Sequence, residues 1–513
     1  MQPVAQPIRS VLVRGATGGA VYAAVGLVQR SLSLLLLPFY ARVLPPDQYG
    51  QIALIVASSA ILSAVLGFGL ETAVLRTAIR LEGQPDERDR FINTLGFFAV
   101  VTPTVGSVVA GGIGAGLLGA SLPVPVDALL IGFLATGLQT SVTVFVGALL
   151  RSEERLRDYA IVTGAYAVTN LAVTVVLVIG LRLGPIGWLA GNLAGSILSL
   201  AIGLALLRHR WSRVFDPGEL RAALLFGIPL LPHTISHWIL GVSDRIVLGA
   251  FISAAGVGVY NLAYQLAAAA ALIVVAVHQG VMPVYAEAGT QTLVRRDLGR
   301  VATFQLYLTV LIGLAVALVG PPLIAILFPP SYAAAGVLIP WIAVGYAFYG
   351  LYLIPMDSLS VMIGRTRWLW VPTAIAAAVN LGLNLALVPR YGATAAAIDT
   401  ALAYGALLIG VVLLRQLGSG PRVPYAVGRM ATGVGVALVV GAVATWAVPA
   451  TNDIASLVAR SLFVLFAGLV LFAIEFRFPN GTGTIPERSD IDLGNEVSEF
   501  GASRDHFLPV TRA

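Results

Sequence analysis

The sequence carries one pattern twice: EERLRDYAIVTGAYAVTNLAVTVVLV at Glu153–Val178, and MIGRTRWLWVPTAIAAAVNLGLNLALV at Met362–Val388. Arg155, Arg157 and Asn170 in the first copy each recur as the same residue type 210 residues later. Three further pairs are separated by 208 residues: Gly50 and Gly258, Asp89 and Asp297, Gly184 and Gly392. Several segments share nearly one offset, which indicates that the chain is an internal duplication.

The composition requires a lipid environment. Of the 513 residues, 58% are hydrophobic and only 11% are charged, whereas a soluble protein has about 25% charged residues. Long apolar runs favour membrane-spanning helices over barrel strands, which alternate in pieces of about ten residues. We count about fourteen spans, each near the 20 apolar residues that a spanning helix needs. We expect an all-α integral membrane protein.

The duplication and the spans together predict the domain organisation. Each copy contains six spans, an even number, so both copies enter the membrane from the same side. They are parallel repeats related by an axis along the membrane normal. The expected parts are a cytoplasmic N-terminus (1–14), a lobe of helices one to six (15–207), a cytoplasmic linker (208–223), a lobe of helices seven to twelve (224–414), helices thirteen and fourteen (415–474), and a disordered cytoplasmic tail (475–513). Helix seven is expected at 224–251.

Arginine in the short loops predicts the orientation, since cytoplasmic loops of membrane proteins are enriched in basic residues. Alternate loops are rich in arginine, and the loops between them hold only Arg42, Arg182 and Arg390. The N- and C-termini fall on the arginine-rich side. The net charge of +6 therefore reflects inner loops and gives no reason to expect a nucleic-acid partner.

Several kinds of chemistry are excluded or unsupported. The chain has no cysteine, which excludes disulfides and cysteine metal sites. It has no lysine, which excludes a Walker-type nucleotide loop. His233 and His237 are spaced i, i+4 but lack the glutamate of a zinc motif. We predict no catalytic residue, no metal site and no cofactor.

Polar residues at bilayer depth are costly and usually face a partner or a water-filled cavity. The candidates for a substrate cavity are Arg30, Glu71, His237, His278, Gln279 and Asp357. Arg30 lies about 24 Å along helix one from Arg14, too deep to reach the inner headgroups. Glu71 has the alternative of neutralising Arg76 or Arg30. Asn380 and Asn384, on helix eleven, have the alternative of bonding helices together, and Asp399 lies on helix twelve.

Two segments resemble a known family. LLLLPFYARVLPPDQYGQIAL at Leu34–Leu54 resembles the first hairpin of the O-antigen and exopolysaccharide flippases, a polysaccharide biosynthesis family. FGIPLLPHTISHWILGVSDRIVLGAFISAAGVGVYNLAYQL at Phe226–Leu266 resembles their helices seven and eight. The family motif residues present are Gly227, Pro229, Pro232, Asp244, Arg245, Gly258 and Tyr260. The resemblance covers about residues 1–420; helices thirteen and fourteen are additional, as in lipid II flippases.

The resemblance implies a place and a function. The family lies within the multidrug/oligosaccharidyl-lipid/polysaccharide (MOP) exporter superfamily. Its members flip undecaprenyl-pyrophosphate-linked oligosaccharides across the cytoplasmic membrane, beside polysaccharide polymerases and glycosyltransferases of the same pathway. Its charged cavity corresponds to Arg30, Glu71, His237 and His278. The alternatives are a lipid II flippase, a cation-coupled multidrug exporter of the same fold, and a membrane-embedded polysaccharide polymerase or ligase. Against the polymerase stands the shortness of every external loop.

Overall fold

The computed structural model describes residues 34–81, 83–117, 123–208, 214–290, 292–418, 420–421, 423–451 and 453–477. Twelve helices within these residues are long and apolar enough to cross a membrane. One of them, α14 (Trp370–Leu417), contains two expected spans, because Gly392 interrupts it with φ 59° and ψ −141°. The first expected span is described only over its end, Leu34–Val43. The prediction of about fourteen spans and an all-α fold is confirmed.

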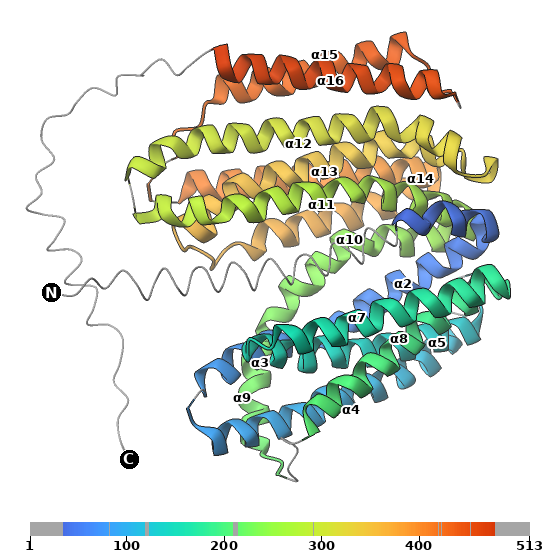
Figure 1. Ribbon diagram of the computed structural model, residues 1–513, viewed down its shortest axis with the longest axis vertical. Coiled ribbons are helices and arrows are strands. Elements are labelled where there is room, and N and C mark those ends of the chain that lie inside the picture. The colour runs from blue at the N-terminus through green and yellow to red at the C-terminus, as the bar shows by residue number, and fades with distance from the viewer. Residues whose placement is uncertain are drawn as a thin grey trace, which may run out of the picture. The chain divides into compact units, whose positions relative to one another are not determined.

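The described part of the first lobe consists of the end of helix one, Leu34–Val43, and of helices two to six (Figure 1). Their bounds are α2 Pro46–Leu66, α3 Leu70–Arg80, α4 Pro85–Leu117, α5 Val126–Ser141, α6 Ala148–Ser152, α7 Leu156–Thr174 and α8 Gly184–Leu206. Helix two is divided into α2 and α3 by Gly67–Gly69, where Gly69 has φ 66°. Within the lobe α5 packs against α4 and α8, and α7 packs against α8.

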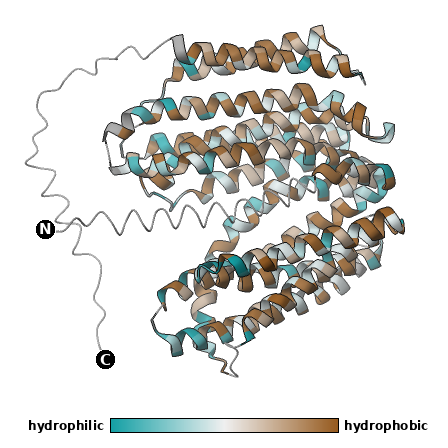
Figure 2. Cartoon of the chain, viewed as in Figure 1, coloured by the Kyte–Doolittle hydropathy of each residue, from teal (hydrophilic) through white to brown (hydrophobic). Residues whose placement is uncertain are grey.

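Helices seven to twelve form the second lobe, to which two further helices are added. Their bounds are α9 Pro217–Gly227, α10 Leu231–Phe251, α11 Ala254–Thr290, α12 Thr292–Leu327, α13 Ala335–Asp357, α14 as above, α15 Val427–Ala447 and α16 Ile454–Arg477. Within the lobe α13 packs against α12 and α14, and α15 packs against α12. Figure 2 shows that hydrophobic residues dominate the helices, as lipid-facing surfaces require.

The two lobes share local conformation at equivalent positions, which is the structural form of the duplication. Gly184 and Gly392 both adopt positive φ, at 58° and 59°. Glu154 and Gly364, 210 residues apart, also both have positive φ. A π-helical segment also lies in each of the equivalent helices four and ten, at Val142–Gly147 and Ser358–Met362, although the two segments do not coincide under the repeat offset. The parallel-repeat architecture is therefore visible in the backbone as well as in the sequence.

Helix seven differs from its expected form. It begins at Pro217, not at residue 224, because the Asp216 side chain caps it by accepting a hydrogen bond from the Gly218 backbone N–H at 2.8 Å. A 3₁₀ turn at Ile228–Leu230 then divides it into α9 and α10. The cap and the polar first turn lie outside the apolar window that defined the expected span.

The chain divides into two compact units, Met1–Gly468 and Leu469–Ala513. The first contains both lobes, α15 and most of α16. In the second, the described residues are the last turns of α16, up to Arg477. The expected tail lies mostly outside the described residues.

Candidate functional site

Glycines at equivalent repeat positions bring the lobes together at one end of the bundle. A methyl group on Gly50 of α2 would overlap the carbonyl oxygen of Ala254, and one on Gly258 of α11 would overlap that of Pro46. Only glycine allows two helix backbones to approach so closely. The Tyr332 hydroxyl also donates across the lobes to the Leu44 carbonyl oxygen at 2.8 Å. This contact, which we name the glycine crossing, lies at the end predicted to be external.

A second close approach involves the break in helix seven. A methyl group on Gly69 would overlap the Gly227 carbonyl oxygen, and one on Gly227 would overlap that of Phe68. The Arg76 guanidinium lies over the Phe226 ring, 4.6 Å from its centroid. α9 thus packs against α3 and α4 of the first lobe (Figure 1). α10 packs against α14 of the second lobe and also against α2 of the first. Helix seven connects the two lobes through its own break.

A buried polar cluster lies inside the second lobe, where α10, α11 and α14 meet. Asp244 and Arg245 are 2% and 5% exposed, and form an ion pair of 2.8 Å. The Tyr260 hydroxyl donates to Asp244 Oδ2, and Arg245 Nε donates to Asn261 Oδ1 at 3.2 Å. Asp244 and Arg245 thus pair with each other, and both side chains are enclosed by neighbouring helices.

The cluster continues to Asp399, which has no exposed surface. Asp399 Oδ2 accepts hydrogen bonds from Asn384 Nδ2 at 2.5 Å and from Asn380 Nδ2 at 3.2 Å. Ser243 donates to Asn380 Oδ1 at 2.9 Å, which joins this half of the cluster to helix seven. Asp399 Oδ1 and Asn384 Oδ1 are buried without a hydrogen-bond partner among the described residues.

The charges and free oxygens of this cluster define what it can bind. When both carboxylates are ionised, Arg245 balances only one of them, and an uncompensated charge at bilayer depth is costly. Two free oxygen acceptors beside an anionic carboxylate suit a proton or a hard monovalent cation. The cluster therefore has the chemistry of a proton or cation site.

A second ionisable pair lies between α11 and the end of α13. His278 Nδ1 is 3.0 Å from Asp357 Oδ2, and Asp357 is 2% exposed. Asp357 directly precedes the π-helical segment Ser358–Met362, a distortion often found at functional sites. The structure therefore brings together two of the six residues predicted for the cavity.

The other predicted cavity residues have different surroundings. Glu71 Oε1 is 2.5 Å from Arg151 Nη2, so the interpretation that it neutralises Arg76 is wrong. Arg151 follows the π-helical segment of helix four and is 80 residues away in the sequence, so no local pattern indicates this pair. His237 and Gln279 have exposed side chains on α10 and α11. Arg30 lies outside the described residues.

The residues that sequence reasoning did not assign to the site are the partners of the buried carboxylates. The sequence did indicate Asp399, Asn380 and Asn384 as candidates, since each is a polar residue within an apolar run. The two asparagines were interpreted as links between helices. Thr400, whose hydroxyl is 3.3 Å from that of Tyr260, carried no signal because threonine is common in spanning helices.

The sequence matches a family model described as "Polysaccharide biosynthesis protein" over residues 16–288, more than half of the chain. No curated protein matches it. The fold is similar to that of the lipid II flippase MurJ in an inward closed conformation, with a TM-score of 0.70 and 15% identity, covering 90% of this chain and 98% of MurJ.

It is also similar to an inward-facing multidrug resistance MATE family transporter of the MOP superfamily. The TM-score is 0.62 at 13% identity, covering 76% of this chain and 94% of the transporter. At these identities the likeness shows the fold: a multi-pass membrane bundle of the MurJ and MATE kind.

Proposed function

The chain belongs to the polysaccharide biosynthesis protein family, and on that premise we propose that it is a flippase for a lipid-linked oligosaccharide. The cargo is a glycan on an undecaprenyl-pyrophosphate type of carrier. The family match carries this proposal, and the MOP-type fold supports it, since the named structural relatives are flippases and transporters. Translocation moves a group across the membrane and changes no covalent bond.

The mechanism is alternating access by movement of the two lobes. The glycine crossing closes the predicted external end, and the largest shared hydrophobic core spans both lobes there through residues such as Leu54, Leu248 and Ile339. The cargo enters from the cytoplasmic side, the crossing separates, and the lobes close behind the sugar. The break in helix seven allows α9 to move with the first lobe while α10 stays with α14 of the second and separates from α2.

The Asp244–Asp399 cluster couples the binding of a proton or cation to the movement of the lobes. Binding of a proton or cation to Asp399 removes an uncompensated charge from the interior of the second lobe. Because helix seven contains both Asp244 and the break at Ile228–Leu230, occupancy of the cluster changes the packing of the element that links the lobes. A ligand can shift such an equilibrium only by its differential affinity for the two states.

The pyrophosphate of the carrier is bound by Arg30. An arginine guanidinium stays charged and binds phosphate oxygens through two parallel hydrogen bonds. Glu71, His237, His278 and Gln279 complete the polar surface that the sugar passes, and the buried Asp357 lies behind it, 3.0 Å from His278. We place the protein in the cytoplasmic membrane with both termini inside, next to the polymerase and glycosyltransferases of its pathway. Reporter fusions after Arg213 and Ala255 test this orientation, and should report cytoplasmic and external positions respectively.

The test is translocation by the purified full-length chain in proteoliposomes. Undecaprenyl-pyrophosphate-linked oligosaccharide, lipid II and a cationic drug are assayed in parallel, and movement is measured by access of a membrane-impermeant reagent to the glycan or by drug uptake. We expect movement of the oligosaccharide above that in protein-free vesicles. Drug movement without glycan movement contradicts the proposal.

Lipid II is the second candidate cargo. The observation that favours it is the likeness of the fold to the lipid II flippase over 90% of this chain. Faster movement of lipid II than of the oligosaccharide in the same vesicles would assign the protein to that cargo.

A further inference from the structure

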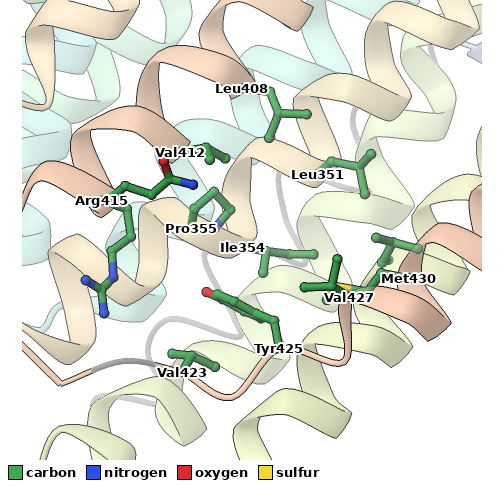
Figure 3. Close-up of a pocket in the computed structure, with 12 residues that line it drawn as sticks. Leu351, Ile354, Pro355, Leu408, Val412, Arg415, Val423, Tyr425, Val427 and Met430 are labelled. Carbon is green, nitrogen blue, oxygen red and sulfur yellow. The ribbon is translucent and has the colours of Figure 1, made fainter.

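A cavity of about 500 Å³ lies in the second lobe, where α13 and α14 meet α15 and the linker before it. Its described lining residues belong to α12–α15 and this linker, so none comes from the first lobe. Leu351, Leu408, Val412 and Met430 form apolar walls (Figure 3). A cavity of this size is in the range that holds one small-molecule ligand. Its apolar walls between spanning helices suit a hydrocarbon chain.

The polar end of the cavity carries a buried cation. Arg415, in the last turn of α14, is 9% exposed. Its Nε donates to Ser358 Oγ at 3.1 Å and its Nη2 donates to the Pro421 carbonyl oxygen, so both acceptors are neutral. No carboxylate of the described chain forms an ion pair with Arg415, and Asp357, which directly precedes Ser358, has its Oδ2 3.0 Å from His278 Nδ1. The cavity therefore has a positive end without a compensating anion.

Figure 3 shows that this polar end also contains Tyr425, with Leu408 and Leu351 at the opposite end of the group. The Tyr425 hydroxyl is shielded from solvent and adds a hydrogen-bond donor beside the guanidinium. The Arg415 end lies on the arginine-rich side of the membrane. Basic pockets between helices on that side bind anionic lipid headgroups.

From the apolar walls and the positive end together, we propose that this cavity binds one acyl chain of an anionic phospholipid from the inner leaflet. The phosphate lies at Arg415 and Tyr425, and the chain extends toward Leu351 and Leu408. The bound lipid is a resident one and not the cargo, because the cavity is built from one lobe and its added helix and lies apart from the contact between lobes. α15 supplies Met430 and the exposed Val427 at the mouth, which gives the thirteenth helix a role.

The experiment compares lipid binding by the delipidated full-length chain, measured by native mass spectrometry with phosphatidylglycerol or phosphatidylcholine. We expect phosphatidylglycerol to bind about five-fold more tightly, the effect of one arginine near an anionic surface. Arg415→Gln should remove this preference. Val412→Trp should fill the cavity and abolish the bound lipid, whereas Leu413→Trp, whose side chain is 51% exposed on the same helix, is the matched control and should bind as wild type.

Three outcomes overturn the proposal. Equal binding of the two phospholipids refutes the role of Arg415, and unchanged binding by Val412→Trp refutes the site. Displacement of phosphatidylglycerol by a stoichiometric amount of polyprenyl phosphate assigns the cavity to the carrier lipid. Thermal unfolding in detergent confirms that each variant is folded, and because no transport is measured, these results stand apart from the test of the flippase function.

Discussion

Asp399 is a carboxylate with no exposed surface on a helix that crosses the membrane. We expect Asp399→Asn to remove the response of transport to a proton or sodium gradient, because the neutral amide no longer needs a bound cation. Coupling energies between sites correspond to factors of about 5–150 in affinity, so gradient stimulation should fall by roughly ten-fold. Transport in proteoliposomes with imposed gradients measures this.

The matched control is Asp297→Asn. Asp297 is 75% exposed and lies near the start of α12, so its replacement should leave the gradient response unchanged. If Asp399→Asn retains full stimulation while the protein is folded, the cluster has a structural role and coupling lies elsewhere.

Arg30 carries the second prediction at this scale. Arg30→Ala should abolish glycan export and leave the protein inserted, because the variant loses the charge that binds the pyrophosphate. Arg30→Lys should restore export only in part, since a point charge lacks the bidentate geometry. Export and membrane abundance are both measured in cells. A well-expressed Arg30→Ala protein that exports normally would end the binding role.

The observed pair of Glu71 with Arg151 predicts the outcome of a second test of Arg30, a double variant with Glu71. If Arg30 were instead a structural partner of Glu71, the double variant Arg30→Ala with Glu71→Ala would recover the abundance lost in the single one. Since Glu71 already pairs with Arg151, we expect no such recovery. Pairs of this kind cannot be read from sequence, because they join helices two and four across 80 residues.

At the level of elements, apolar length and the repeat offset were sufficient to predict the helices and their order. The positions of the breaks were not. The Ile228–Leu230 turn follows from Pro229 and Pro232 only once it is known that α9 continues upstream to Pro217. The polar first turn of α9, with Glu219 and Arg221, is short and does not register as a membrane span.

The break within α14 allows a matched pair of glycine substitutions. Gly392 has φ 59° and ψ −141°, which only glycine adopts readily, and it has space for a methyl group. Gly392→Ala should therefore destabilise the fold by about 1–3 kcal/mol through backbone strain alone. Gly382, on the same helix, has no positive φ, and no atom lies within 4 Å of the place that an added methyl group would take. Gly382→Ala should be neutral or stabilising by about 0.5–1 kcal/mol.

Unfolding in detergent, followed by circular dichroism, measures both variants. Equal effects of the two substitutions would contradict the assignment of Gly392 as the strained position between helices eleven and twelve. A loss of stability at Gly392 alone supports it and shows that the offset of 208 residues to Gly184 marks a conformational requirement.

At the scale of the whole molecule, equivalent glycines of the two repeats form the contact between the lobes at the glycine crossing. Two residues at the same repeat position, Gly50 and Gly258, lie on neighbouring helices of opposite lobes and remove the side chains that would keep the backbones apart. The repeat offset predicted their equivalence. It did not predict their contact, because sequence gives no position for the axis that relates the lobes.

The last prediction therefore concerns Gly258→Ala. The added methyl group meets the backbone of Pro46 and not a flexible side chain, so it can be accommodated only by separating α2 from α11. Overpacking of this kind costs about 1–3 kcal/mol, which shifts a two-state equilibrium by roughly 5- to 150-fold toward the externally open state. Because the chain has no cysteine, spin labels can be placed directly at Val126→Cys and Val337→Cys, one in each lobe near the predicted external end. The distance between the two labels, measured by pulsed electron paramagnetic resonance, should lengthen in Gly258→Ala and in Gly50→Ala. Gly241→Ala on α10, with no atom near its added methyl group, should leave the distance unchanged. If Gly258→Ala impairs transport without altering the distance, the crossing serves packing within a fixed interface, and the external gate has to be sought elsewhere in the bundle.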